Sequence, residues 1–343
     1  MTGGGARRLW DKIRGQVAAE ADHLHIKFFP LENGALMKPD DSYVSVWLSE
    51  LFLANEVAWG VERSPAVHAS VRLRFGGVSQ KNFVTLAQPP VGTGHGVFQD
   101  YQLTELMPYR GHTIELQASL FEILGKNNLG TAIDILTSFA SLVTPPISAA
   151  LTVADLVASG IEKVIEANAQ DPVLYLQATL AAPGAGLSNE LRPGWLIVVH
   201  ATESELPIAE LHLDENGRLC RNGNRLTGFD YMVLRIEGRK ERDDWRTPDL
   251  DEAIGQAARA KDVGSMADYE RQRANALSLI YLSADLTPPQ RQQVAQMVKE
   301  ELDGAQPGAV AAGELTIASI VDRRGLPSRE SVRQLTLADL LAT

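Results

Sequence analysis

Residues 67–75 read Val-His-Ala-Ser-Val-Arg-Leu-Arg-Phe, with apolar and polar side chains in strict alternation. Successive side chains of a β-strand point to opposite faces, so this stretch predicts a strand with one face on a core and the other in water. Residues 114–120, 174–180 and 232–236 repeat the alternation. Polar turns such as Asn222-Gly223 separate many of the short segments. Short strands joined by polar turns predict a sandwich or a barrel, and of these we take the antiparallel β-sandwich as the predicted fold.

Helical periodicity replaces the alternation after Glu241. Residues 249–261, 266–282 and 288–302 are each predicted to form a helix. The third has Thr287 as its N-cap, Pro288 at its first position and Gln290 three residues after the cap, which is the pattern of a capping box. We therefore predict an α+β protein with four parts: an N-terminal helix at 1–21, a β-sandwich at 22–240, a helical region at 241–303, and a linker and C-terminal tail at 304–343.

The centre of the chain carries no charged side chain between Asp134 and Asp155. A membrane-spanning helix needs about 20 apolar residues, but Pro145-Pro146 divides this run into two arms. We expect a helical hairpin at 129–168, inserted in the sandwich. Three interpretations stay open: a core hairpin packed on the sheet, a membrane-active hairpin that a partner or a protease releases, or an interface with a partner protein. Its candidate contact residues are Leu136, Phe139, Val143, Ile147, Leu151 and Leu156.

Composition restricts the possible partners and the compartment. The chain has 43 acidic and 32 basic side chains and a net charge of −11, which argues against nucleic acid as a partner. The single cysteine, Cys220, excludes an internal disulfide and suits a reducing compartment. No apolar run follows Arg7 and Arg8, so we expect no secretory signal and a cytoplasmic location.

Few residues suggest chemistry. His23 and His25 are spaced to project from one face of a strand, as metal ligands sometimes do, but no second cluster completes a site. The glycine-rich residues 92–96 lack the lysine and hydroxyl of a phosphate-binding loop. The acidic residues between 237 and 244 alternate with basic ones, which favours a salt-bridged junction over an acid–base pair. The sequence therefore predicts no catalytic residue, no metal site and no cofactor.

One resemblance concerns the segments Leu24-His25-Ile26-Lys27-Phe28 and Asp41-Ser42-Tyr43-Val44. Together they resemble the opening of the calcium- and lipid-binding β-sandwich domains of the protein kinase C type, which carry Asp-Pro-Tyr-Val at this corner. The resemblance implies that Asp41 matches their first-loop aspartate. Ala35 stands where those domains have an acidic partner, and no Asp-x-Asp pair follows. Calcium takes about six to eight oxygen ligands, so the resemblance implies a sandwich fold rather than a calcium site.

These observations predict a non-catalytic, bacterial-type scaffold, adaptor or effector component that binds another protein. One alternative is a membrane-active, pore-forming effector that uses residues 129–168 and meets a membrane only after activation. A second alternative is an enzyme whose site is not recognisable from sequence. Arg323 and Arg324 form a candidate site for a trypsin-like protease, because dibasic pairs in exposed segments are readily cleaved.

Overall fold

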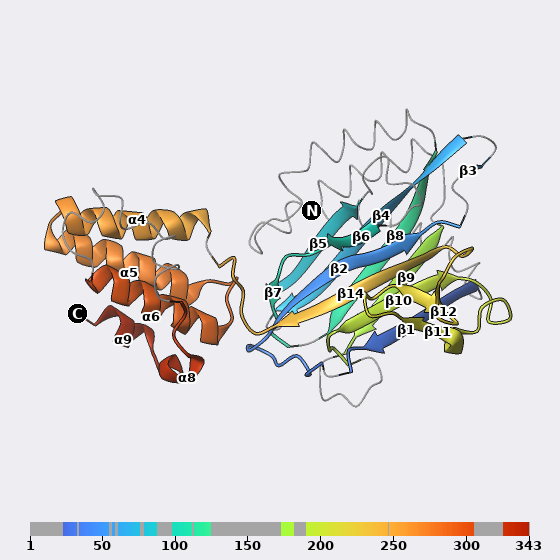
Figure 1. Cartoon of the computed structure of the whole chain (residues 1–343). Coiled ribbons are helices and arrows are strands. Elements are labelled where there is room, and N and C mark those ends of the chain that lie inside the picture. Colours follow the sequence, from blue (N-terminus) through green and yellow to red (C-terminus); the bar gives the residue numbers. More distant parts are fainter. Residues whose placement is uncertain are drawn as a thin grey trace. The chain divides into compact units, whose positions relative to one another are not determined.

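The computed structural model describes residues 23–32, 34–54, 57–58, 61–75, 79–87, 98–111, 113–124, 173–181, 190–245, 247–304 and 325–342. These residues form two compact units (Figure 1). The first, which we call the sheet unit, contains the described residues up to 39 and those from 44 to 238. The second, the helical unit, contains 40–43 and the described residues from 239 onward. Antiparallel strands precede C-terminal helices, which confirms the predicted α+β class.

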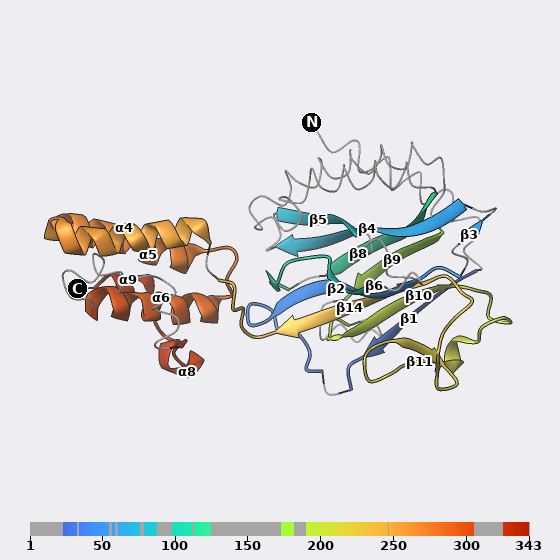
Figure 2. The same ribbon diagram turned by 45° about the horizontal axis from the view of Figure 1, so that its top comes forward.

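The first sheet of the sheet unit joins strands from both ends of that unit (Figure 2). Its order is β1-β10-β14-β2-β6, and β7 also pairs with β2. The register runs from Leu24 opposite His200 in β1 and β10 to Trp47 opposite Gln102 in β2 and β6. The strands are β1 (Leu24–Pro30), β2 (Tyr43–Phe52), β6 (Phe98–Gln102), β7 (Met107–Pro108), β10 (Gly194–His200) and β14 (Tyr231–Arg239).

The second sheet contains three of the segments with clear alternation. Its order is β3-β4-β8-β9, and β5 pairs with β4. The predicted strands at 67–75, 114–120 and 174–180 lie side by side in it, each antiparallel to the next. This confirms the strand prediction for these segments. The strands are β3 (Val57–Ala58), β4 (Val61–Phe75), β5 (Ser79–Ala87), β8 (Ile114–Leu124) and β9 (Leu174–Leu180).

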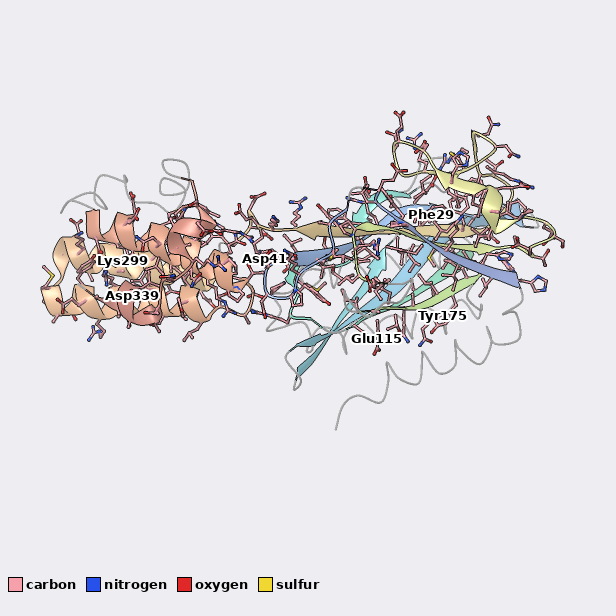
Figure 3. The ribbon with its side chains drawn as sticks, turned by 90° about the horizontal axis from the view of Figure 1, so that it is seen from below. Phe29, Asp41, Glu115, Tyr175, Lys299 and Asp339 are labelled. Atoms are coloured by element: carbon pink, nitrogen blue, oxygen red, sulfur yellow. The ribbon has the colours of Figure 1, made fainter. Side chains whose placement is uncertain are left out.

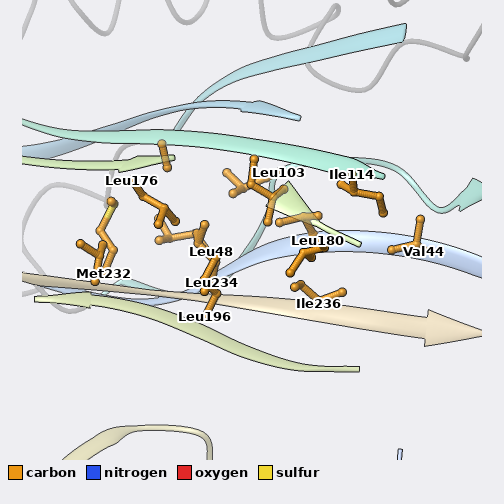
Figure 4. Close-up of a cluster of buried hydrophobic side chains, with 14 of the residues drawn as sticks. Val44, Leu48, Leu103, Ile114, Leu176, Leu180, Leu196, Met232, Leu234 and Ile236 are labelled. Atoms are coloured by element: carbon orange, nitrogen blue, oxygen red, sulfur yellow. The ribbon is translucent and has the colours of Figure 1, made fainter. Parts of the chain in front are cut away.

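The two sheets share one hydrophobic core. In Figure 4, Leu48 and Leu234 from the first sheet and Leu176 from the second point into the space between the sheets. Each fully buried leucine contributes about 1.5–3 kcal/mol relative to an exposed one. Residues at the alternate positions, such as Glu115 and Tyr175, point away from this core (Figure 3). The alternation in the sequence therefore marks the core face of the second sheet.

A short meander covers part of the outer face of the first sheet. It consists of the 3-10 turn η3 (Ile208–Glu210) and the strands β11 (Leu211–Leu213), β12 (Leu219–Arg221) and β13 (Asn224–Arg225). Asn222 and Gly223 have φ of 51° and 77°, the left-handed geometry of a two-residue hairpin turn. Ile197 and Val199 are buried beneath the meander, while Leu196 and Val198 are buried in the shared core. Because β10 is covered on both faces, its sequence is a continuous apolar run.

The helical unit is built on three long helices, at the positions predicted from the sequence. Thr247 and Ser265 cap the first two helices by accepting from the backbone N–H groups of Leu250 and Asp268. Trp245 is buried in the core of this unit. The helices are α4 (Pro248–Val263), α5 (Met266–Leu282) and α6 (Pro288–Gly304), followed by the short α8 (Arg329–Val332) and α9 (Leu337–Leu341).

The start of α6 differs from the predicted capping box. Pro288 is its first residue, as predicted. The Thr287 N–H, however, donates to the Tyr43 hydroxyl at 2.8 Å. The Gln290 amide accepts from the Arg242 N–H at 3.1 Å and donates to the Arg242 carbonyl at 2.6 Å. Contacts with segments distant in sequence therefore occupy the Thr287 N–H and the Gln290 amide, which a capping box would pair with each other.

The last turn of α6 is held by a carboxylate. Asp303 accepts from Arg273 at 2.6 and 2.9 Å, from Lys299 at 3.0 Å and from the Tyr269 hydroxyl at 3.2 Å. Lys261 donates to the backbone carbonyls of Leu302 and Asp303. Cations at the C-terminal end of a helix also complement its dipole. Asp303 thus connects α5 with the end of α6.

Asp303→Asn should destabilise the helical unit at pH 7 by about 1–3 kcal/mol, because hydrogen bonds to charged groups are lost. Burial raises the pKa of Asp303, but hydrogen bonds from Arg273 and Lys299 outweigh it and hold the pKa well below its usual range. A lowered pKa stabilises the fold above the unfolded-state pKa of about 4, and this stabilisation is lost as the pH falls through the folded-state value. Hydrogen exchange of the α4–α6 amides measures the difference between variant and parent.

That difference should shrink as the pH falls from 5 to about 2, because Asp303 becomes protonated in the unfolded parent while its lowered pKa keeps it ionised in the folded parent. Glu330→Gln is the matched control, since Glu330 and Arg333 form an exposed pair at 4.0 Å in the same unit. Exposed pairs contribute about 0–1 kcal/mol. A difference for Asp303→Asn that stays constant over this pH range would contradict the proposed role of the charge.

Candidate functional site

Three of the sequence predictions fall outside the described residues. These are the N-terminal helix at 1–21, the hairpin at 129–168 with its contact residues, and the proteolytic candidates Arg323 and Arg324. All three therefore stay predictions. Within the described ranges, no helix combines the length and the apolar character needed to cross a membrane.

The residues considered for metal binding have partners within the protein. His25 Nδ1 lies 3.5 Å from a carboxylate oxygen of Glu203, and the ring of His23 packs edge-to-face on His200 with centroids 6.2 Å apart. Asp41, which the calcium-domain resemblance singled out, accepts from Arg329 at 2.6 Å. In the part of the chain that the structure describes, no group of three or more histidine, cysteine, aspartate or glutamate side chains could hold a metal ion.

Two buried ionisable groups lie where the meander meets the first sheet. Burial and the carboxylates of Asp214 and Glu50 raise the pKa of Cys220, so its thiol stays protonated at neutral pH. Glu50, only 1% exposed, accepts from Arg225 at 3.0 and 2.7 Å and from the Leu219 N–H at 2.9 Å. This carboxylate is paired and hydrogen-bonded, which indicates that it fastens the meander to β2 rather than transferring protons.

A different arrangement lies on the outer face of the first sheet, on the neighbouring strands β2 and β14. The guanidinium of Arg235 stands over the ring of Trp47, with its central carbon 5.0 Å from the ring centroid. The indole N–H of Trp47 donates to the Ser45 hydroxyl at 2.9 Å, and that hydroxyl donates to Glu237 at 3.4 Å. The ring, the cation and the hydroxyl therefore fix one another's positions.

Two carboxylates complete this group, which we call the Trp47 cluster (Ser45, Trp47, Asp100, Arg235 and Glu237). Arg235 lies 3.4 Å from Asp100 and 3.8 Å from Glu237. One guanidinium and two carboxylates leave a formal charge of −1 on the cluster. Asp100 is 63% exposed and Arg235 28%, so both can be reached from solvent. Asp100 also has a φ of 51°, and backbone outliers of this kind gather at functional sites.

The chemistry of the Trp47 cluster suits recognition. An aromatic ring, a guanidinium and carboxylates offer flat apolar contact, hydrogen-bond donors and acceptors on one surface. The one hydroxyl that could act as a nucleophile belongs to Ser45, which is buried and already bonded on both sides. The arrangement therefore supports binding better than catalysis.

Sequence reasoning missed this cluster because three strands contribute to it. β14, β2 and β6 are adjacent in the sheet, but their residues are spread from 45 to 237. The available signal was Trp47 itself, since the alternate positions Val44, Val46 and Leu48 face the core. Trp47 lies on the opposite, outer face of β2 and belongs to neither of the two buried clusters that the described residues of the sheet unit form.

Searches against family models, curated proteins and solved structures find no match for this chain.

Proposed function

We propose that this chain is a non-catalytic protein-binding module whose sheet unit binds a partner protein through the Trp47 cluster. The observation that carries the proposal is the stacked pair of Trp47 and Arg235 on a partly exposed sheet face. Tryptophan and arginine are the residue types most enriched at binding hot spots. A partner that excluded water from this face would strengthen both the stacking and the ion pairs of Arg235.

We also propose that the sheet unit is a β-sandwich, since its two antiparallel sheets share one core. In a β-sandwich each sheet has an outer face. The outer face of the first sheet consists of two areas. The meander covers the part formed by Ile197, Val199, Tyr231 and Val233. Trp47 and Arg235 belong to the remaining part. This division leaves a defined area of the sheet for a partner.

Trp47→Ala and Arg235→Ala should each weaken partner binding by at least about 30-fold, because hot-spot truncations cost about 2 kcal/mol or more. The partner is first captured on the tagged full-length protein, identified by mass spectrometry and purified. Titration calorimetry with the purified partner then gives the affinity of each variant. A parallel thermal melt checks that each variant is folded.

Arg221→Ala is the matched control. Arg221 forms a partly exposed pair with Glu210 at 2.7 Å, so the substitution also removes one arginine–carboxylate pair from the sheet unit. It lies on the meander, outside the Trp47 cluster. We expect its affinity for the partner to change less than threefold. If both cluster variants bind the partner as tightly as Arg221→Ala does, the proposed site is wrong.

A further inference from the structure

Strand β1 is paired along one side only. It runs antiparallel to β10, with Leu24 opposite His200 and Pro30 opposite Gly194. The His23 carbonyl accepts from Ala201 at 2.8 Å, and the Leu31 N–H donates to Pro193 at 2.9 Å. In an antiparallel pair, residues alternate between those that exchange hydrogen bonds with the partner strand and those that do not. The odd-numbered residues of β1 therefore bond to β10.

The even-numbered residues Leu24, Ile26 and Phe28 direct their backbone N–H and C=O groups to the other side. We call these groups the β1 edge. The order of the first sheet ends at β1, so among the described residues no strand pairs with this edge. Unpaired backbone groups at a sheet edge are a template for an additional strand. The β1 edge is thus a candidate for strand addition.

The side chains beside the β1 edge are apolar. Leu24 and Phe28 are half-buried against the shared core, and Ile26 between them is 44% exposed. Edge strands are often protected by a lysine that keeps other strands away. Lys27 is engaged elsewhere: its ammonium donates to the Ile208 carbonyl at 3.1 Å and lies 4.5 Å from the Phe29 ring centroid. Within β1 itself, Pro30 limits the edge at one end, because it lacks an N–H.

We propose that the β1 edge binds an extended segment of a partner protein as an added antiparallel strand. Three residues of that segment would face Leu24, Ile26 and Phe28 and exchange about six backbone hydrogen bonds with them. We expect these three residues of the added strand to be apolar. They would lie on the same face as Leu24, Ile26 and Phe28 and would cover the exposed Ile26. The residues between them would face His25 and Lys27. A carboxylate there would complement the lysine, because an ammonium has three donors and Lys27 gives one of them to Ile208. The occupant is therefore a strand that alternates apolar and acidic residues.

A second copy of this chain fits the β1 edge less well. Antiparallel pairing of two β1 strands about Ile26 would place Lys27 of one chain opposite His25 of the other. That pairing supplies no carboxylate to complement Lys27. A strand of a different protein with an acidic residue at this position complements Lys27 better.

The probe is a fluorescent peptide with the core Val-Glu-Val-Glu-Val, titrated into the full-length protein and followed by anisotropy. Two matched peptides separate backbone pairing from nonspecific association. N-methylation of the valine amides removes the donors that face β1, while N-methylation of the glutamate amides removes donors that face away. We expect saturable binding of the unmodified and glutamate-methylated peptides, and at least tenfold weaker binding of the valine-methylated one.

Two variants test the edge from the side of the protein. Ile26→Pro deletes the central N–H of the edge, and proline is tolerated in edge strands where the N–H faces away from the sheet. Ile26→Ala retains this N–H and shortens the side chain. We expect at least tenfold weaker peptide binding for Ile26→Pro and less than threefold for Ile26→Ala. In the parent protein, the peptide should slow amide exchange at Ile26 and Phe28 but not at Lys27.

Three results would overturn the proposal: no saturable binding, equal affinity for the two methylated peptides, or an Ile26-dependent dimer of the protein alone in sedimentation. The methylated peptides keep the test decisive even if Ile26→Pro does not fold. The proposal is independent of the Trp47 cluster, so Trp47→Ala should bind the peptide like the parent.

Discussion

Arg225→Met should lower the free energy of unfolding of the sheet unit by about 3 kcal/mol, the low end of the cost of removing one partner of a buried ion pair. The low end applies because Glu50 is buried but the Arg225 side chain is 34% exposed. Glu50 lies on β2 beneath the meander and is 1% exposed. Arg225 supplies two of the hydrogen bonds to this carboxylate, at 3.0 and 2.7 Å. Without Arg225, the Glu50 carboxylate would still accept the hydrogen bond from the Leu219 N–H. That donor is neutral, so the buried negative charge would have lost its counter-charge. Urea unfolding followed by hydrogen exchange of β10 and β14 amides measures the loss.

Two further variants show whether the charge is the cause. Arg221→Met removes the partly exposed pair with Glu210 from the same meander, and such surface pairs contribute about 0–1 kcal/mol. The double variant Glu50→Gln with Arg225→Met should be more stable than Arg225→Met alone, because no buried charge remains unpaired. An Arg225→Met protein as stable as Arg221→Met would mean that the Glu50 carboxylate is solvated and does not fasten the meander.

Strands could be predicted from the sequence where their two faces differ in polarity. Helices could be predicted where their capping residues belong to the same segment of the chain. Ile114 and Leu116 alternate with Glu115 and Gln117, and this segment is part of β8 as predicted. The three long helices also begin and end within a few residues of the predicted positions. In both cases the information lies within one segment of the chain.

Features that depend on distant segments could not be found in the same way. β10 lacks alternation because the meander covers its second face, and its neighbours β1 and β14 come from opposite ends of the unit. Gln290 matched a local capping pattern, yet its amide binds Arg242. The members of the Trp47 cluster become neighbours only through the order of the strands, which alternation does not encode.

The shared core of the two sheets gives the second large expected effect. Leu48→Ala on β2 and Leu176→Ala on β9 should each destabilise the sheet unit by about 2–5 kcal/mol, since both side chains are fully buried. Truncation removes the transfer free energy of the leucine and leaves a cavity that the surrounding side chains fill only in part. Urea unfolding with hydrogen exchange of β8 and β14 amides reports on each sheet separately.

The double variant tests whether the two sheets depend on one core, as the proposed sandwich requires. Leu48 and Leu176 belong to the same buried cluster but to different sheets. Residues that share a cavity couple by about 0.5–3 kcal/mol, whereas independent sites add within about 0.3–0.5 kcal/mol. We therefore expect the loss in the double variant to differ from the sum of the single losses, and Leu48→Ala to accelerate exchange in β8 as well as in β14. Additive losses, with exchange accelerated only in the sheet that carries the substitution, would show that the sheets unfold independently and would contradict the sandwich.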